Sequence, residues 1–261
     1  MRPTLKTLTL PAAVLTLSIA SAAQTTIEKN GPAFQESHST QSVRAPRLVK
    51  AFVVDDRLSV LRREADVKSQ VVQRLRLGRP VYIIGSRSGA ATRPRCYRVA
   101  VTRRTRGWIH ASAVSIPGQP GEDKRVLRLA ENAGDGFDRI TLCLLLIERF
   151  KSSPLVPNAL LAMAAEAERV APTLSERAAK RASALDPRTA NASLRDYYLN
   201  DAVLDRYSKL RVSFDFDEAA GQYVYDGWAY RVIIKRFPAS EAAKTARERL
   251  VVMEQQLARC E

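Results

Sequence analysis

The sequence predicts an α+β multidomain protein: a small antiparallel β-barrel followed by an α-helical domain that carries an inserted β-hairpin. Short apolar and β-branched runs separated by Gly, Pro and Ser fill the stretch from Leu48 to Pro117, which is typical of short strands joined by turns. Helical periodicity replaces them after Pro117. A period-two run of aromatic residues between Phe214 and Tyr225 interrupts the helical pattern and indicates the hairpin.

The first 23 residues have the composition of a secretory signal peptide. A mostly apolar run from Leu8 to Ile19 follows two basic residues and ends in small residues, which predicts cleavage after Ala22 or Ala23. The run is too short for a transmembrane span; the alternative is a leader that stays uncleaved as an anchor. We therefore expect an exported protein, periplasmic or extracellular, with no transmembrane span after cleavage.

Residues 24–46 are rich in Gln, Ser and Thr, lack periodicity, and predict a disordered tether. The barrel is expected over residues 47–117, with strands at 51–54, 81–84, 97–101 and 107–109. Alternation is clearest in the third run, where Tyr97, Val99 and Val101 would face a core while the residues between them face solvent.

Three short motifs in this stretch resemble the bacterial SH3-like (SH3b) family. Leu58-Ser59-Val60 followed by Arg62 is similar to its "LNVR" segment, Gly78 to Val81 to its "G-x-x-V" strand entry, and Gly107-Trp108-Ile109 to its "GWV" ending. The resemblance implies a small barrel that binds a ligand in an aromatic-lined groove. Cys96 stands where many members have an aromatic residue, usually Trp.

Positive charge is concentrated in the expected barrel. Residues 44–117 contain 17 Lys and Arg against 4 Asp and Glu, a net charge of +13, whereas residues 118–261 contain 22 against 21. Such asymmetry predicts salt-sensitive attraction to polyanions. For an exported protein these are anionic lipid headgroups, lipopolysaccharide phosphates or peptidoglycan carboxylates; nucleic acid is physically possible but disfavoured by export. The alternative is a solvated basic face without a ligand.

We expect the envelope contact to use Arg side chains, because guanidinium groups bind carboxylate and phosphate bidentately. The candidate ligand-binding residues are Arg62, Arg98, Arg103, Arg104 and Trp108.

Residues 118–122 predict a linker and residues 123–261 a helical domain. Within it, an internal repeat recurs at an offset of 87, with Arg149-Phe150 and Ser153 matching Arg236-Phe237 and Ser240. Each copy predicts an αα-hairpin. The turn Arg236-Phe-Pro-x-Ser240 resembles the "Y-P-x-S" turn of tetratricopeptide-like (TPR-like) periplasmic proteins, which implies a domain that binds a protein partner.

The hairpin is expected near residues 211–226. Its aromatic residues predict a peptide-contact patch on the helical domain, unless they belong to the core. The acidic residues Asp215, Asp217 and Glu218 do not match the calcium-binding EF-hand spacing, so no metal site is expected. The candidate partner-binding residues are Tyr198, Tyr223, Tyr225 and Trp228.

Signals for catalysis are weak. The chain has two His, and it lacks a Gly-rich phosphate loop, a G-x-S-x-G elbow and zinc-ligand spacing. A Cys96–His110 pair is the nearest arrangement to a nucleophile and base. We expect a non-enzyme without a cofactor. Of the three Cys, Cys143 and Cys260 are the candidates for a disulfide that would tie the two repeat copies together.

The sequence thus favours an exported, non-catalytic adaptor. Its basic SH3-like barrel would bind an envelope polyanion, foremost peptidoglycan, and its helical domain a protein partner. The first alternative is a structural protein that assembles without an envelope ligand. The second is a divergent cell-wall hydrolase with an acidic site.

Overall fold

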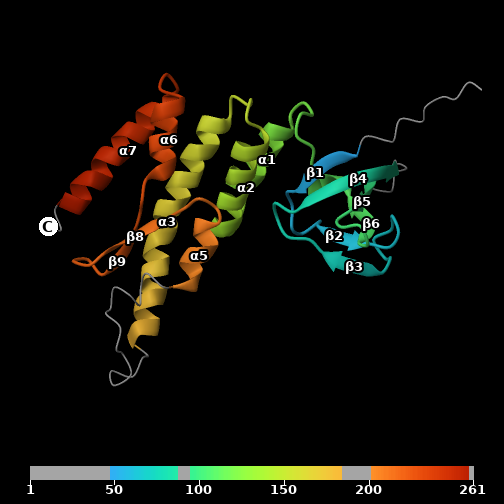
Figure 1. The fold of residues 1–261 in the computed structure, drawn as a ribbon, viewed down its shortest axis with the longest axis horizontal. Helices are drawn as coiled ribbons and strands as arrows, with labels where there is room; N and C mark the ends of the chain where they lie inside the picture. The colour runs from blue at the N-terminus through green and yellow to red at the C-terminus, as the bar shows by residue number, and fades with distance from the viewer. Residues whose placement is uncertain (1–47, 88–94, 184–200, 259–261) are drawn as a thin grey trace, which may run out of the picture. The chain divides into compact units, whose positions relative to one another are not determined.

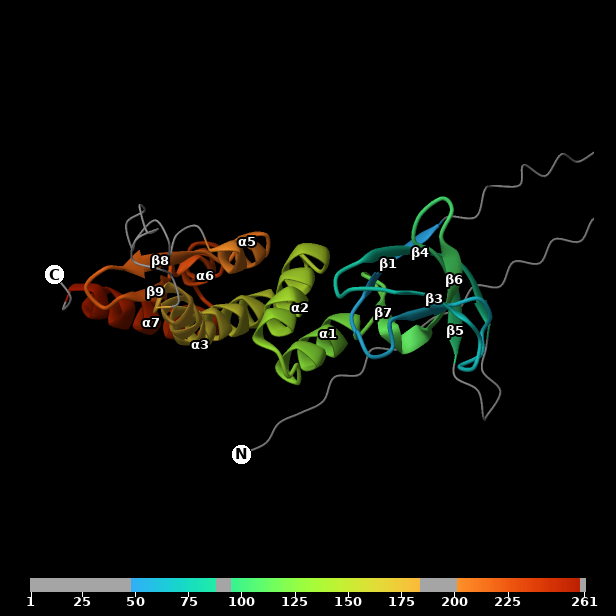
Figure 2. The ribbon, with the colours of Figure 1, turned by 90° about the horizontal axis from the view of Figure 1, so that it is seen from below.

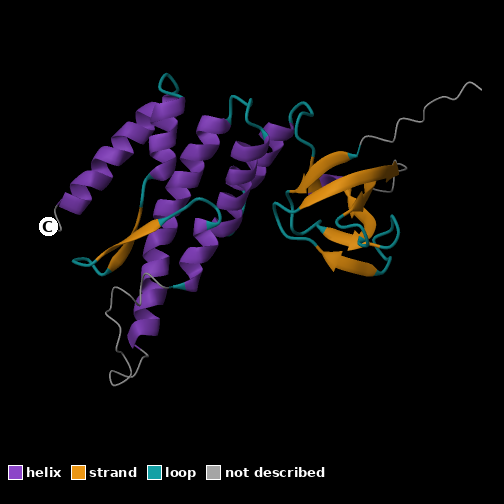
Figure 3. Ribbon diagram, in the orientation of Figure 1, coloured by secondary structure: helices purple, strands orange, loops and turns teal. Residues whose placement is uncertain are grey.

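The computed structural model describes residues 48–87, 95–183 and 201–258. The expected signal peptide and tether, residues 1–46, lie outside them. Residues Pro46–Glu261 form one compact unit, and its described part is a mixed α+β structure (Figure 1). Figure 3 shows that strands and helices occupy separate stretches of this unit, apart from one hairpin among the helices.

Seven antiparallel strands form one sheet in the order β3-β2-β6-β5-β4-β1-β7. The outermost strands, β3 and β7, do not pair with each other among the described residues, so the sheet is not closed into a barrel by hydrogen bonds. A 3₁₀ turn, Ala111–Ala113, precedes the last strand. The strands are β1 (Val49–Val53), β2 (Val60–Arg62), β3 (Val71–Arg74), β4 (Pro80–Arg87), β5 (Cys96–Ala100), β6 (Arg106–His110) and β7 (Val114–Ser115).

The side chains on one face of this sheet form a hydrophobic core. Alternate residues of successive strands point into it, so the core is built by the period-two pattern. Gly107 lets β6 approach β2 closely: a Cβ there would lie 2.6 Å from the carbonyl oxygen of Arg62. The buried side chains are Ala51, Val53, Leu61, Leu75, Val81, Val99, Ile109, Ala113 and Val114.

Six α-helices lie in the described part after the sheet. Helix α2 contacts α1 and α3, and α3 contacts α6 and α7. They are α1 (Glu122–Glu131), α2 (Gly136–Arg149), α3 (Val156–Ser183), α5 (Ala202–Ser208), α6 (Trp228–Arg236) and α7 (Glu241–Ala258).

Helix α3 is longer than the sequence suggests. Thr173 and Glu176 have the spacing of a capping box and predict a new helix after Val170, yet the helix runs through Pro172. Proline removes one backbone hydrogen bond from a helix interior. Packing offsets that loss, because Ala171 and Leu174 continue the buried face of the helix across the proline.

The two repeat copies have the same turn geometry. Phe150 and Phe237 follow the last residues of α2 and α6 with similar backbone angles: φ is −116° and −133°, and ψ is near 50° in both. In each turn the serine N–H donates to the phenylalanine carbonyl, at 2.8 Å for Ser153 and 3.0 Å for Ser240. The copies contact each other directly through α3 and α6, rather than through intervening helices as the sequence spacing suggests.

A two-stranded antiparallel hairpin, β8 (Phe214–Asp217) and β9 (Gln222–Tyr225), lies along α3 (Figures 1 and 2). Its turn contains Gly221 at φ 64°, a left-handed conformation that favours glycine. The hydroxyl of Ser175 on α3 accepts a 2.8 Å hydrogen bond from the backbone N–H of Tyr223. The hairpin is therefore joined to the helix by a buried polar contact as well as by packing.

Strand β1 contributes to two hydrophobic cores. Ala51 and Val53 point into the core of the sheet, whereas Phe52, together with Val54 just after the strand, belongs to the core of the helices. The guanidinium of Arg149 lies 4.8 Å from the centre of the Phe52 ring. Consecutive side chains of one strand thus pack against different parts of the compact unit.

Candidate ligand-binding face of the sheet

The face of the sheet opposite its core carries a cross-strand row of three predicted site residues. Arg62 on β2 is the register partner of Trp108 on β6, and Trp108 is the partner of Arg98 on β5. Directly opposed residues of antiparallel strands lie on the same face with their Cβ atoms about 5 Å apart. The row therefore places an indole between two guanidinium-bearing side chains.

A second row lies beside the first. Cys96 on β5 pairs with His110 on β6 and with Arg87 on β4. The signal that could have found this face was the alternation of Arg106, Trp108 and His110 along β6. Of these three residues, only Trp108 is among the predicted ligand-binding residues, because strand pairing cannot be derived from a single strand's pattern.

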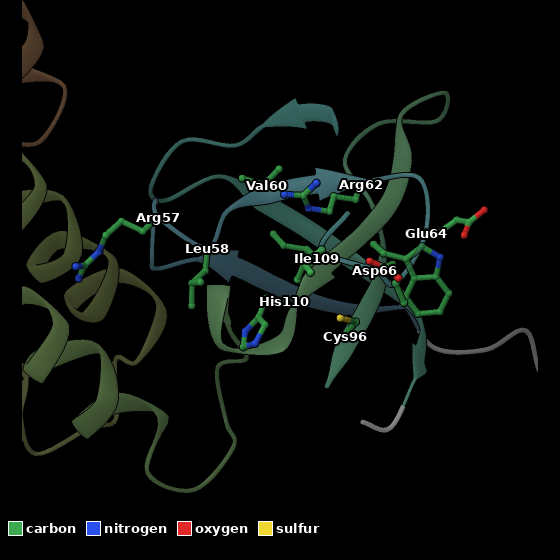
Figure 4. Close-up of a pocket in the computed structure, with 12 residues that line it drawn as sticks. Arg57, Leu58, Val60, Arg62, Glu64, Asp66, Cys96, Ile109 and His110 are labelled. Carbon is green, nitrogen blue, oxygen red and sulfur yellow. The ribbon is translucent and has the colours of Figure 1, made fainter. Parts of the chain in front are cut away.

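The first row borders a pocket of about 310 Å³. Figure 4 shows its side chains spread from Arg57 and Leu58 at one end to Glu64 at the other, with Arg62 and Asp66 between them. The lining combines two cations, two carboxylates and an indole. Its residues are Arg57, Leu58, Val60, Arg62, Glu64, Ala65, Asp66, Val67, Cys96, Trp108, Ile109 and His110.

The loop that carries the two carboxylates is closed by hydrogen bonds. Arg62 donates from Nη1 to the carbonyl oxygen of Ser69 at 2.7 Å, and the Ser69 hydroxyl accepts from the Glu64 N–H at 3.0 Å. Asp66 accepts from the Lys68 N–H at 2.7 Å. Arg62 thus holds the loop in place, while Arg98 on β5, two strands away, is exposed and available to a ligand.

The Cys96–His110 pair does not have the features of an activated nucleophile. Burial raises the pKa of the Cys96 thiol, and the opposing effect of the nearby Arg87 charge is smaller. A catalytic thiol needs a lowered pKa. Nδ1 of His110 accepts a 3.1 Å hydrogen bond from the Ser112 N–H and caps the 3₁₀ turn, which gives the imidazole a structural role.

The remaining predicted envelope contacts lie at one end of the sheet. Arg103 and Arg104 are exposed in the turn between β5 and β6, where the Thr102 hydroxyl accepts from the Thr105 N–H at 2.9 Å. They are outside the Arg62–Trp108–Arg98 row. The structure therefore brings together three of the five predicted residues and places the other two at the end of neighbouring strands.

The predicted aromatic contact patch is wrong for two of its residues. Tyr223 and Tyr225 are each 2 % exposed and belong to the core of the helices. The alternating aromatic face of the hairpin points inward because α3 covers it, and the Tyr225 hydroxyl accepts a 2.8 Å hydrogen bond from the Ala229 N–H. Trp228 is half-buried against the same core, and Tyr198 lies outside the described residues.

The predicted disulfide remains a prediction, because Cys260 lies outside the described residues. Cys143 is fully buried in α2, and burial raises the pKa of its thiol to about 12.

Comparison with protein families, curated proteins and solved structures finds no match to this chain. Within the described ranges, no group of three or more His, Cys, Asp or Glu is placed to hold a metal ion. None of the helices in those ranges combines the length and apolarity that crossing a membrane requires.

Proposed function

We propose that the protein is an exported, non-catalytic adaptor whose basic sheet binds an anionic polymer of the cell envelope, foremost peptidoglycan. In this proposal residues 47–117 are an SH3-like (SH3b) module, and the two αα-hairpins form a TPR-like domain that binds a protein partner. The Arg62–Trp108–Arg98 row carries the proposal.

The chemistry of the row and its pocket supports a peptide-bearing anionic polymer. The exposed guanidinium of Arg98 can bind a carboxylate with charge-assisted hydrogen bonds, and the indole of Trp108 offers a flat surface for sugar or peptide. Glu64 and Asp66 on the adjoining loop suit the amino groups of peptidoglycan stem peptides. A simple polyphosphate would gain nothing from these two carboxylates, because like charges repel.

Motif residues also meet in space. Arg62, from the segment similar to "LNVR", is the register partner of Trp108, from the segment similar to "GWV". The first and the last of the three motifs thus lie at one pocket, which supports the proposed SH3-like module.

The test is co-sedimentation of residues 24–261 with insoluble peptidoglycan at low and moderate salt. We expect salt-sensitive pelleting of the wild type. Arg98→Ala should weaken it about tenfold, as expected for one charge-assisted contact. Arg62→Ala with Arg98→Ala should weaken it further, because Arg62 also holds the loop that carries Glu64 and Asp66. The matched control replaces Lys235 and Lys244, two exposed cations of the helices, with Ala, and it should pellet like the wild type.

Three results would contradict the proposal. The row variant could pellet as well as the control, which would mean that general positive charge explains retention. The wild type could stay soluble but assemble with rising concentration, which would favour a structural protein. Release of soluble muropeptides from the pellet would indicate a hydrolase.

A further inference from the structure

A second surface on the same face of the sheet combines exposed apolar side chains with Arg. Leu48, Tyr82 and Ile84 are 58 %, 39 % and 37 % exposed. The register places Tyr82 on β4 opposite Ala100 on β5, and Ala100 opposite Arg106 on β6. Tyr82, Ala100 and Arg106 therefore form a continuous area across three strands, which begins two residues along β6 from Trp108.

This area is slightly hollow and has no acidic residue in its lining. The hollow measures about 380 Å³ and lies at the end of the sheet where the β5–β6 turn begins. Its lining differs in charge from the Trp108 pocket, which contains Glu64 and Asp66. The residues are Leu48, Tyr82, Ile84, Ala100, Val101, Thr102, Arg103 and Arg106.

An apolar centre with a cationic rim is complementary to an anionic lipid surface. Interfacial binding combines burial of apolar side chains at the headgroup boundary with attraction of Lys and Arg to anionic lipids. A soluble polyanion would use the two Arg but would leave Leu48 and Ile84 in water. We propose that this surface, defined by Leu48, Tyr82, Ile84, Arg103 and Arg106, docks the protein on an anionic lipid bilayer.

The docking proposal is independent of peptidoglycan binding. It uses neither Arg62 nor Arg98 nor Trp108, and it would place the chain on a membrane surface whichever polymer the first site binds. It also assigns Arg103 to a lipid contact, whereas the sequence pattern groups this residue with Arg62, Arg98 and Trp108.

Vesicle co-sedimentation tests the proposal with residues 24–261, which contain the whole compact unit but not the expected leader. The probes are vesicles of phosphatidylcholine alone and vesicles in which about 30 % of the lipid is anionic phosphatidylglycerol, which attracts Lys and Arg near the surface. We expect binding to the anionic vesicles only. Arg103→Ala with Arg106→Ala should weaken it about thirtyfold.

The apolar half of the surface needs its own variant. Leu48→Ser with Ile84→Ser removes exposed side chains, so folding should be unaffected, and should weaken binding on the order of tenfold or more. The matched control is Val71→Ser with Val72→Ser on the edge strand β3, which are 47 % and 42 % exposed. This control should bind like the wild type.

Each other outcome would overturn the proposal. Loss of binding in the Arg variant but not in Leu48→Ser/Ile84→Ser would mean charge attraction without docking. If Val71→Ser with Val72→Ser weakened vesicle binding as much as Leu48→Ser with Ile84→Ser, binding could not be assigned to this surface. Absence of vesicle binding, with a dimer that Leu48→Ser/Ile84→Ser dissociates, would make a second copy of the chain the occupant. Because the Arg62→Ala/Arg98→Ala variant should bind vesicles normally, failure here is distinguishable from failure at the peptidoglycan site.

Discussion

A buried carboxylate holds the first repeat copy together, and removing it gives the sharpest stability prediction. Glu166 on α3 is 2 % exposed. Its Oε2 accepts from Arg139 Nη1 at 2.7 Å and from Arg169 Nε at 3.0 Å, and Arg169 Nη2 donates to Oε1. Gly136 faces this carboxylate, where any Cβ would overlap Oε1.

The loss in free energy of unfolding expected for Glu166→Ala depends on the two Arg side chains that lose their carboxylate partner. Breaking a buried ion pair by removing one partner costs about 3–5 kcal/mol. Arg169 is mostly exposed and is rehydrated easily, so the lower end of that range applies. Arg139 keeps hydrogen bonds to the carbonyls of Ala130 and Ala133 at the end of α1. We expect a loss of about 3 kcal/mol, with Glu166→Gln intermediate.

Urea denaturation followed by circular dichroism measures the change in the free energy of unfolding. The matched control is Glu176→Ala, an exposed carboxylate on the same helix, whose effect should stay within about 0.5 kcal/mol. A thermal melt should show a decrease of about 6–12 °C in Tm for Glu166→Ala. Equal unfolding free energies for the two variants would refute the assignment of the Glu166 cluster as a buried stabilising contact.

Three further predictions concern other parts of the chain. Gly107→Ala should lower the free energy of unfolding by at least about 2 kcal/mol, because its Cβ would meet backbone 2.6 Å away; an unchanged urea midpoint would contradict the close approach of β6 to β2. The Ser153 hydroxyl donates a 2.6 Å hydrogen bond to Asp123 and lowers the pKa of this carboxyl. The ionised carboxyl therefore stabilises the fold fully at neutral pH, and this contribution is lost as pH falls through the lowered pKa, below 3.8. The gap in urea midpoint between wild type and Ser153→Ala should therefore narrow in acid, and a gap that is constant from pH 7 to 3 would count against this bond. Cys143 should resist iodoacetamide at pH 8 in the native protein, because its thiol is buried with a pKa of about 12. It should react once the protein is denatured without reductant. Failure to react after denaturation would instead support the bridge to Cys260.

Local patterns predicted much of the secondary structure. The alternation of Tyr97, Val99 and Val101 indicated a strand, and β5 (Cys96–Ala100) ends one residue before Val101, with Val99 buried. The offset of 87 indicated two helical hairpins, and both turns have the same serine-to-phenylalanine hydrogen bond. These features depend on residues close in sequence, which a single chain displays directly.

Strand pairing and side-chain burial could not be predicted from such local patterns. Strands β2 and β3 have three and four residues, and every residue of β3 is exposed. Neither therefore has the longer apolar or alternating run by which a strand is predicted from sequence. The aromatic face of the hairpin has the same period two whether it faces water or a helix, and only the position of α3 decides that Tyr223 is buried. Likewise, the Arg62–Trp108 pairing joins residues from distant segments and depends on register.

The two-sided strand β1 affects how the protein can be divided. Cutting the chain in the 118–122 segment would leave Phe52 and Val54, which are 3 % and 1 % exposed in the whole chain, without the helices that cover them. An isolated sheet fragment would then present a new apolar surface and tend to aggregate. The sheet and the helices are therefore expected to melt together in a single transition, and excision would not yield a portable binding module.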